Sequence, residues 1–151
     1  MKQFEDLAEL SNHVGEDIGK SALLKITQER IDEFAKVTMD EQWVHTQPEM
    51  AAKHSPYKAT IAHGYLTQSL IPYLISQVFT VSSVKMGVNY GSDKVRFMSP
   101  VLVDSHIYLS VKLLAAEEIQ KGRRLKTECT VYIDGNDKPA CVAELITLMY
   151  E

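Results

Sequence analysis

Cysteine is scarce in this sequence, and its scarcity removes two structural classes at the outset. The 151 residues include only Cys129 and Cys141, which are not spaced as metal ligands. Both lie in strand-like stretches, so we expect reduced thiols that pack in the core as small apolar side chains. A disulfide framework and a cysteine-ligated metal centre are therefore excluded.

Long apolar runs are also absent. No segment approaches the roughly 18 uninterrupted apolar residues that a membrane-spanning helix needs. The first ten residues, MKQFEDLAEL, place acidic side chains where a secretory signal peptide needs an apolar run. These absences predict a cytoplasmic protein with no membrane partner.

An excess of positive charge is missing as well, because the formal net charge is -4 and the basic residues are scattered. Nucleic acids and anionic membrane surfaces bind clustered cations, so both are excluded as partners. Small molecules and a second copy of the chain remain. With no repeat, no Pro/Gly/Ser-rich linker and 45% apolar content, the sequence predicts one domain over residues 1–151.

Helical patterns occupy the first half of the chain. Residues 4–10 have helical spacing, residues 22–26 suit a short strand, and Thr27 suits the N-cap of a further helix. Pro48 suits the first turn of a short helix that continues through Ala52. The most apolar helix is predicted over 62–79, and Pro72 should kink it. Its apolar stripe consists of Leu66, Leu70, Tyr73, Leu74 and Val78.

Beyond residue 83 the apolar period changes to two, which is typical of a half-buried strand. Strand segments are predicted at 86–90, 95–97, 107–113, 125–133 and 140–150, with a bulge or bend at Gly91 and Ser92. A sheet of about five strands cannot bury a face by itself. We therefore predict an α+β fold in which an antiparallel sheet, completed by the strand at 22–26, wraps around the long helix.

The loop MDEQWVHTQP, residues 39–48, places Asp40 and His45 close together in sequence. Residues five apart on an ideal helix lie about 140° apart around its axis, so these side chains can cooperate only where the chain folds back. Gln42 and Trp43 stand at that point. Pattern alone favours the ordinary alternative, a surface loop with a solvated histidine.

A second polar feature, AHG at residues 62–64, opens the apolar helix. Gly64 allows backbone N–H groups to approach a ligand, and the helix dipole favours negative charge there. Alternatively, Gly64 only relieves crowding and His63 only starts the helix. Together, the loop and the helix start offer an acid, a base and an oxyanion stabiliser, as chemistry beside a carbonyl group requires.

The pattern Asp40-x-Gln42-x-x-His45, followed by AHG, a long helix and five strands, resembles the MaoC-like (R)-specific enoyl-CoA hydratases of the hot-dog fold. Their motif is written D-x-N-P-x-H. Gln42 replaces its Asn and Trp43 its Pro, as in the branch related to nodulation protein N. The stretch VNYGSDKVRFMSPV, residues 88–101, also resembles that branch, and the resemblance covers nearly the whole chain.

The resemblance implies hydration of a trans-2-enoyl-CoA to an (R)-3-hydroxyacyl-CoA, and the reverse dehydration, by a water held between Asp40 and His45. Acyl-CoA or acyl-carrier-protein thioesters are the expected substrates, without a metal or cofactor. A homodimer is the expected assembly, because hot-dog sheets commonly pair edge to edge. The implied oxyanion and substrate contacts are Gly64, His63, Gln42, Asn89 and Tyr90.

Two alternatives stay open from the sequence. A hot-dog acyl-thioesterase commonly uses an acidic residue on or near the central helix, whereas residues 63–79 contain none. A non-catalytic acyl-binding dimer module would not need the Asp40 and His45 side chains.

Overall fold

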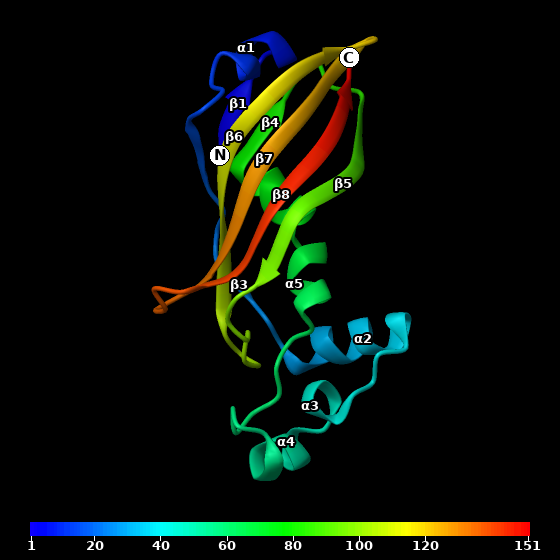
Figure 1. Ribbon diagram of the computed structural model, residues 1–151, viewed down its shortest axis with the longest axis vertical. Coiled ribbons are helices and arrows are strands. Elements are labelled where there is room, and N and C mark those ends of the chain that lie inside the picture. Colours follow the sequence, from blue (N-terminus) through cyan, green and yellow to red (C-terminus); the bar gives the residue numbers. More distant parts are fainter.

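A long antiparallel sheet forms one layer of the protein in the computed structural model, which describes residues 1–151 (Figure 1). Its strand order is β2-β6-β7-β8-β5, and the short β3 also pairs with β6. The α+β class and the antiparallel sheet are therefore confirmed. The strands are β2 (Asp17–Lys20), β3 (Leu24–Lys25), β5 (Met86–Phe97), β6 (His106–Ile119), β7 (Gly122–Ile133) and β8 (Pro139–Tyr150).

The alternation of apolar and polar residues along the strands gives the sheet one buried face. The side chains of Ile107, Leu109, Val111 and Leu113 on β6 are fully buried, and the residues between them are not. Successive side chains of a strand point to opposite faces, so one face of β6 packs in the core while the other meets solvent. Both cysteines lie in this core as free thiols.

The central helix is broken into α5 (Gly64–Ser69) and α6 (Ile71–Val78). The break falls at Leu70, directly before the first turn of α6 that contains Pro72, so the predicted kink is confirmed. α6 packs against β6, and α5 packs against β8. Tyr73 was predicted on the buried stripe, but it is 52% exposed, because α6 turns that side away from the sheet.

The N-terminal prediction was partly wrong. Residues 2–4 form strand β1 (Lys2–Phe4), which pairs in parallel with β4 (Phe79–Val81) and packs Phe4 against Phe79. The helix α1 (Leu7–Ser11) begins only after Asp6, whose carboxylate accepts the Glu9 N–H at 2.7 Å. The predicted strand at 22–26 is reduced to β3, and β2 was not predicted.

Three helices lie beyond one end of the sheet, near the start of α5 (Figure 1). They are α2 (Gln28–Thr38), α3 (Trp43–Thr46) and α4 (Pro48–His54). The Thr27 hydroxyl accepts the Arg30 N–H at 3.3 Å, which confirms the predicted N-cap. Pro48 occupies the first turn of α4 as predicted. No helix of the chain has the length and apolar content needed to cross a membrane.

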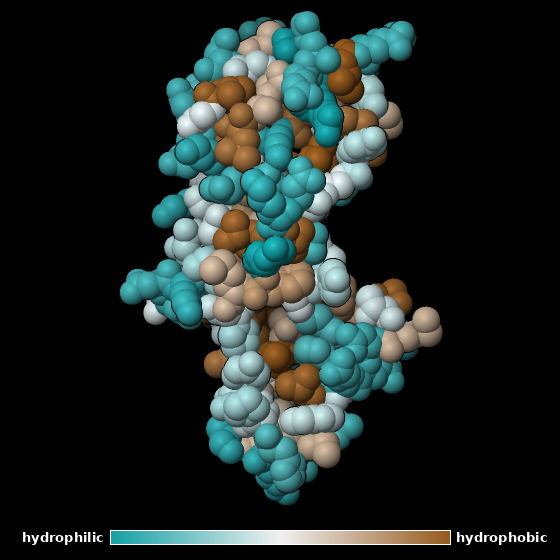
Figure 2. Space-filling view, viewed as in Figure 1, coloured by the Kyte–Doolittle hydropathy of each residue, from teal (hydrophilic) through white to brown (hydrophobic).

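The edge strand β5 is bent, and most of its residues are exposed. Its register with β8 shifts between Asn89 and Gly91, which confirms the predicted irregularity. Large apolar side chains are exposed on β5 and just after it, at Met86, Val88, Tyr90, Phe97 and Met98. Figure 2, drawn in the same orientation as Figure 1, shows apolar surface over the middle of the molecule.

Packing of the central helix supplies the first prediction. Leu74 is 0% exposed and belongs to the main apolar cluster. Leu74→Ala should lower the free energy of unfolding by about 2–5 kcal/mol, because it removes buried methyl groups and leaves a cavity. The neighbouring Tyr73→Ala should lower it by less than about 1 kcal/mol. Urea unfolding of both variants measures the difference, and equal losses would contradict the orientation of α6.

Candidate active site

The loop between α2 and α3 folds back on itself. Met39, the C-cap of α2, has φ 61°, a left-handed conformation that ends the helix and turns the chain. Asp40 follows this turn, and His45 is the third residue of α3. Their side-chain ligand atoms, together with one from His63, all lie within 4.8 Å of one another. Asp40 and His45, which can come together only where the chain folds back, are therefore neighbours in the structure.

His45 is 9% exposed and fixed at one ring nitrogen. Its Nδ1 lies 2.7 Å from the carbonyl oxygen of Ile61. Because a carbonyl only accepts, Nδ1 donates and the neutral ring has its lone pair on Nε2. Burial lowers the pKa of His45 below its ordinary value of 6.5, and the field of His63 adds to the effect; the bond to Ile61 and the charge of Asp40 oppose it.

The backbone of α3 is anchored by a residue that sequence reasoning missed. Gln28, the first residue of α2, donates from Nε2 to the carbonyl oxygen of His45 at 2.7 Å. Its Oε1 accepts from the buried hydroxyl of Thr60. Nothing distinguishes Gln28 in the sequence from any polar residue in a first helical turn, because the two partners through which it anchors α3, His45 and Thr60, are distant in the chain.

His63 lies at the centre of the cluster and is 3% exposed. Its Nε2 donates to the backbone carbonyl of Asp40 at 2.9 Å. Its ring stacks on His45 with centroids 3.8 Å apart and also contacts Phe34. Nδ1 of His63 is buried and has no hydrogen-bond partner. The side chain therefore packs against the Asp40 and His45 pair.

Asp40, His45 and His63 have the donor set of a metal site, but the rings are poorly placed for one. Imidazole lone pairs lie in the ring plane and bind an ion at about 2.0–2.1 Å. The rings of His45 and His63 are stacked face to face, with centroids 3.8 Å apart and 26° between their planes, so their in-plane lone pairs do not converge on one ion. This geometry favours proton transfer over metal binding.

Gly64 begins α5, and its N–H has no acceptor in the protein. The Phe97 ring lies over its Cα, so that an added Cβ would come within 2.7 Å of the ring. A side chain at this position would therefore displace the Phe97 ring, which agrees with the alternative that Gly64 relieves crowding. The partner in this contact could not be predicted, because Phe97 is 33 residues away at the end of β5.

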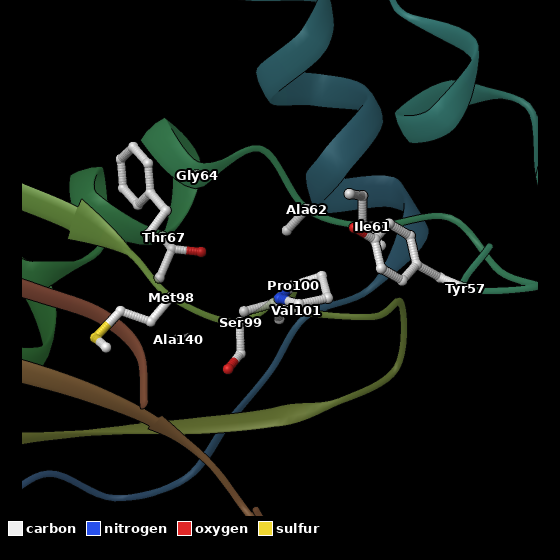
Figure 3. A pocket seen from close by; sticks show the side chains of 11 residues that line it. Tyr57, Ile61, Ala62, Gly64, Thr67, Met98, Ser99, Pro100, Val101 and Ala140 are labelled. Atoms are coloured by element: carbon white, nitrogen blue, oxygen red, sulfur yellow. The ribbon is translucent and has the colours of Figure 1, made fainter. Parts of the chain in front are cut away.

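A cavity of about 300 Å³ opens beside Gly64 (Figure 3). It lies between the start of α5, Tyr57 and the segment 97–101, and its wall includes Ile61, whose carbonyl holds His45. The buried Thr67, one turn along α5, also lines it and makes no side-chain hydrogen bond. The cavity has an apolar wall with few polar groups beside Gly64 and Ile61, as expected for a small-molecule site, whereas Asp40 and His45 do not line it.

The structure does not bring every predicted site residue into this cluster. The Gln42 side chain is exposed and makes no hydrogen bond, although its carbonyl accepts from the first turn of α3. Asn89 and Tyr90 lie on β5 roughly 25 Å along the strand from Phe97, at about 3.3 Å per residue. Their contact with substrate stays a prediction.

Sheet, helix and site together define a class of protein. An antiparallel sheet packed on a central helix is the hot-dog arrangement, and here an acid and a neutral histidine lie beside the start of that helix. The chain matches the family model described as "MaoC like domain" over residues 9–134. It belongs to this family of dehydratases and is a hydro-lyase, as the sequence predicted.

Individual relatives agree with the family. The chain is 44% identical over 147 residues to 3-hydroxyacyl-thioester dehydratase Z of Mycobacterium tuberculosis, covering 97% of each. It is 39% identical to nodulation protein N of Rhizobium leguminosarum bv. viciae, covering 95% of this chain and 90% of that protein. The unliganded R-hydratase PhaJ1 from Pseudomonas aeruginosa superposes with a TM-score of 0.77 at 25% identity, covering 97% of this chain and 86% of that one.

The lowered pKa of His45 predicts a pH dependence of stability. The unfolded chain binds a proton at this residue near pH 6.5, whereas the folded chain binds it only at lower pH. The contribution is therefore fully present above about pH 6.5 and is lost as the pH falls below it. His45→Asn retains a donor for the Ile61 carbonyl and should flatten this dependence. Urea unfolding at about pH 7.5 and 5.5 measures it, and unchanged dependence would contradict the assignment.

Proposed function

We propose that this protein adds water reversibly to a trans-2-enoyl thioester and forms an (R)-3-hydroxyacyl thioester, with CoA as the first choice of carrier and acyl-carrier protein as the second. The observation that carries the proposal is the closeness of the Asp40 carboxylate and a ring nitrogen of His45, within 4.8 Å, in a ring whose Nε2 is left unprotonated by the bond from Nδ1 to Ile61. The names of the 3-hydroxyacyl-thioester dehydratase and the R-hydratase support the same reaction.

We propose that one water bridges these two groups. A water oxygen about 2.8 Å from each of two acceptors, with tetrahedral geometry, joins atoms about 4.6 Å apart. Asp40 and His45 Nε2 are both acceptors, so each takes one of the two hydrogens of the water. The lone pairs of the water oxygen then face away from the protein groups and toward C3 of the enoyl chain.

The protonation state restricts the path of the proton. Nδ1 of His45 holds its proton for Ile61, and burial disfavours a second proton on the ring. The proton that reaches C2 is therefore one that the attacking water releases to the pair. Asp40 is our choice for the base that first accepts it. Since both groups come from one loop, oxygen and proton are added to the same face of the double bond.

The developing charge on the thioester oxygen needs a donor, and the free N–H of Gly64 is the one we assign. It lies at the start of α5, directly after His63. Such a donor is worth roughly 3 kcal/mol in the transition state of other enzymes. Gly64→Ala is not a clean test, because the added Cβ would displace Phe97 and alter packing together with the N–H.

Substitution of Asp40 and of His45 tests the proposed function. Asp40→Asn and His45→Asn should each lower kcat for crotonyl-CoA hydration by about a hundredfold or more, because general acid-base groups contribute 10² to 10⁴. The matched controls are Asp137→Asn and His54→Asn, both at exposed positions, which should keep wild-type rates.

Loss of the enoyl-thioester absorbance, chirality of the product and release of free thiol are followed together. Near-normal hydration by either site variant would overturn the role of the pair. Thiol release without hydration would instead identify a thioesterase.

For assembly we propose a homodimer through the edge of β5, supported by the exposed Val88 and Tyr90 on an unpaired edge. Sedimentation should give twice the 17.0 kDa chain mass. Val88→Glu combined with Tyr90→Glu should shift the protein to monomer, whereas the exposed control Val37→Glu should not. A monomeric wild type would contradict the proposal.

For the compartment we propose the cytoplasm. The two free cysteines are buried, and burial raises the pKa of each to about 11, so they are unreactive thiols that suit a reducing environment.

A further inference from the structure

Asp40 is poorly tethered for a residue that must hold a water in place. It follows the left-handed turn at Met39 and precedes α3, so it belongs to neither helix. The Nε2 of His63 donates to its carbonyl at 2.9 Å, and this is the only hydrogen bond that Asp40 makes with the rest of the chain. Its N–H and its carboxylate make none.

We propose that His63 is a positioning residue, whose Nε2–H and stacked ring together fix Asp40 relative to His45 and Gly64. The proposal rests on the hydration reaction described above and gives His63 a task other than substrate contact. It also explains why a polar ring occupies a site that is 97% removed from solvent, where a plain apolar side chain would fill the space.

The bond to Asp40 is effective because His63 is itself held firmly. Ala62, the residue before it, donates its N–H to the Val101 carbonyl at 2.8 Å. The carbonyl of His63 accepts the Thr67 N–H in the first turn of α5. A residue fixed on both sides thus transmits its position to the otherwise free Asp40 loop. Since Gly64 is the next residue, the same bond sets the spacing between the water and the oxyanion donor.

The stacked ring has the second part of the task. His63 covers one face of His45 at 3.8 Å and contacts Phe34 of α2, so His45 cannot tilt away from the water. The Ile61 carbonyl fixes the ring of His45 at Nδ1, and the stack fixes its plane. Asp40 and His45 are thereby oriented by one side chain, which contacts both of them and has no other polar partner.

Two substitutions separate the hydrogen bond from the ring. His63→Phe retains an aromatic ring against His45 but leaves the Asp40 carbonyl without a donor. His63→Gln places an amide N–H near the position of Nε2 but removes the ring. His63→Phe should lower kcat for crotonyl-CoA about tenfold or more and change KM less than about twofold, because misplacing a catalytic group by about 1 Å slows the reaction strongly. His63→Gln should restore part of the loss.

A double-mutant cycle decides whether His63 acts through Asp40. In the Asp40→Asn background, His63→Phe should reduce kcat by less than about twofold further, because the group it positions is already lost. If the two losses multiply, or if His63→Phe alone is as active as wild type, the proposal is overturned. His63→Met replaces His63→Phe as the donor-free variant if the latter does not fold.

A readout independent of activity keeps the two proposals distinguishable. His63→Phe should speed amide hydrogen exchange at His45 and Thr46, which donate to the Gln42 carbonyl at the end of the loop, at least about tenfold relative to wild type while leaving α2 unchanged, since the loop that supplies their acceptor loses its tether. His63→Gln should stay close to wild type. Unchanged exchange at both residues overturns the positioning role. A wild-type protein that fails to hydrate crotonyl-CoA but shows these exchange effects refutes the proposed function alone.

Discussion

The extended segment from Thr60 to His63 is the part of the structure on which the site depends. Its Ile61 bridges to Leu102, and Ala62 bonds to Val101, so the segment is fixed to the framework beside the sheet. Two parts of the candidate site are then attached to it: Thr60 holds Gln28 and through it the α3 backbone, and Ile61 holds the His45 ring. A short helix and a loop at the end of the sheet obtain fixed positions in this way, although neither is stable by itself.

Local chemistry explains which parts of the fold could be predicted. The N-cap of α2, the start of α4 at Pro48 and the break before Pro72 each depend on a few adjacent residues, and all three agree with the structure. β1 and β2 depend on pairing partners far along the chain. Residues 4–10 look helical because Phe4, Leu7 and Leu10 are spaced as on a helix, and all three are indeed buried, but Phe4 reaches the core from a strand. Spacing alone does not distinguish these cases.

The candidate site, too, combines features that depend on adjacent residues with contacts that depend on distant ones. Asp40 and His45 stand out because their residue types and spacing resemble a known motif, and their closeness needed only the turn at Met39. The contacts that orient them involve backbone carbonyls, at Ile61 for His45 and at Asp40 for His63. A carbonyl exists at every residue, so the sequence contains no signal that singles out these two. For this reason the surroundings of the pair had to come from the structure.

His63 also shows how stability and function are balanced here. Its buried Nδ1 has no partner, and an unsatisfied buried polar atom costs about 1–3 kcal/mol. An apolar side chain of similar volume would avoid that cost and pack equally against Phe34. It could not donate to the Asp40 carbonyl, which would then be unsatisfied in place of Nδ1. The histidine therefore exchanges one unsatisfied atom for another, and what it gains is a bond to the residue that we propose holds the water.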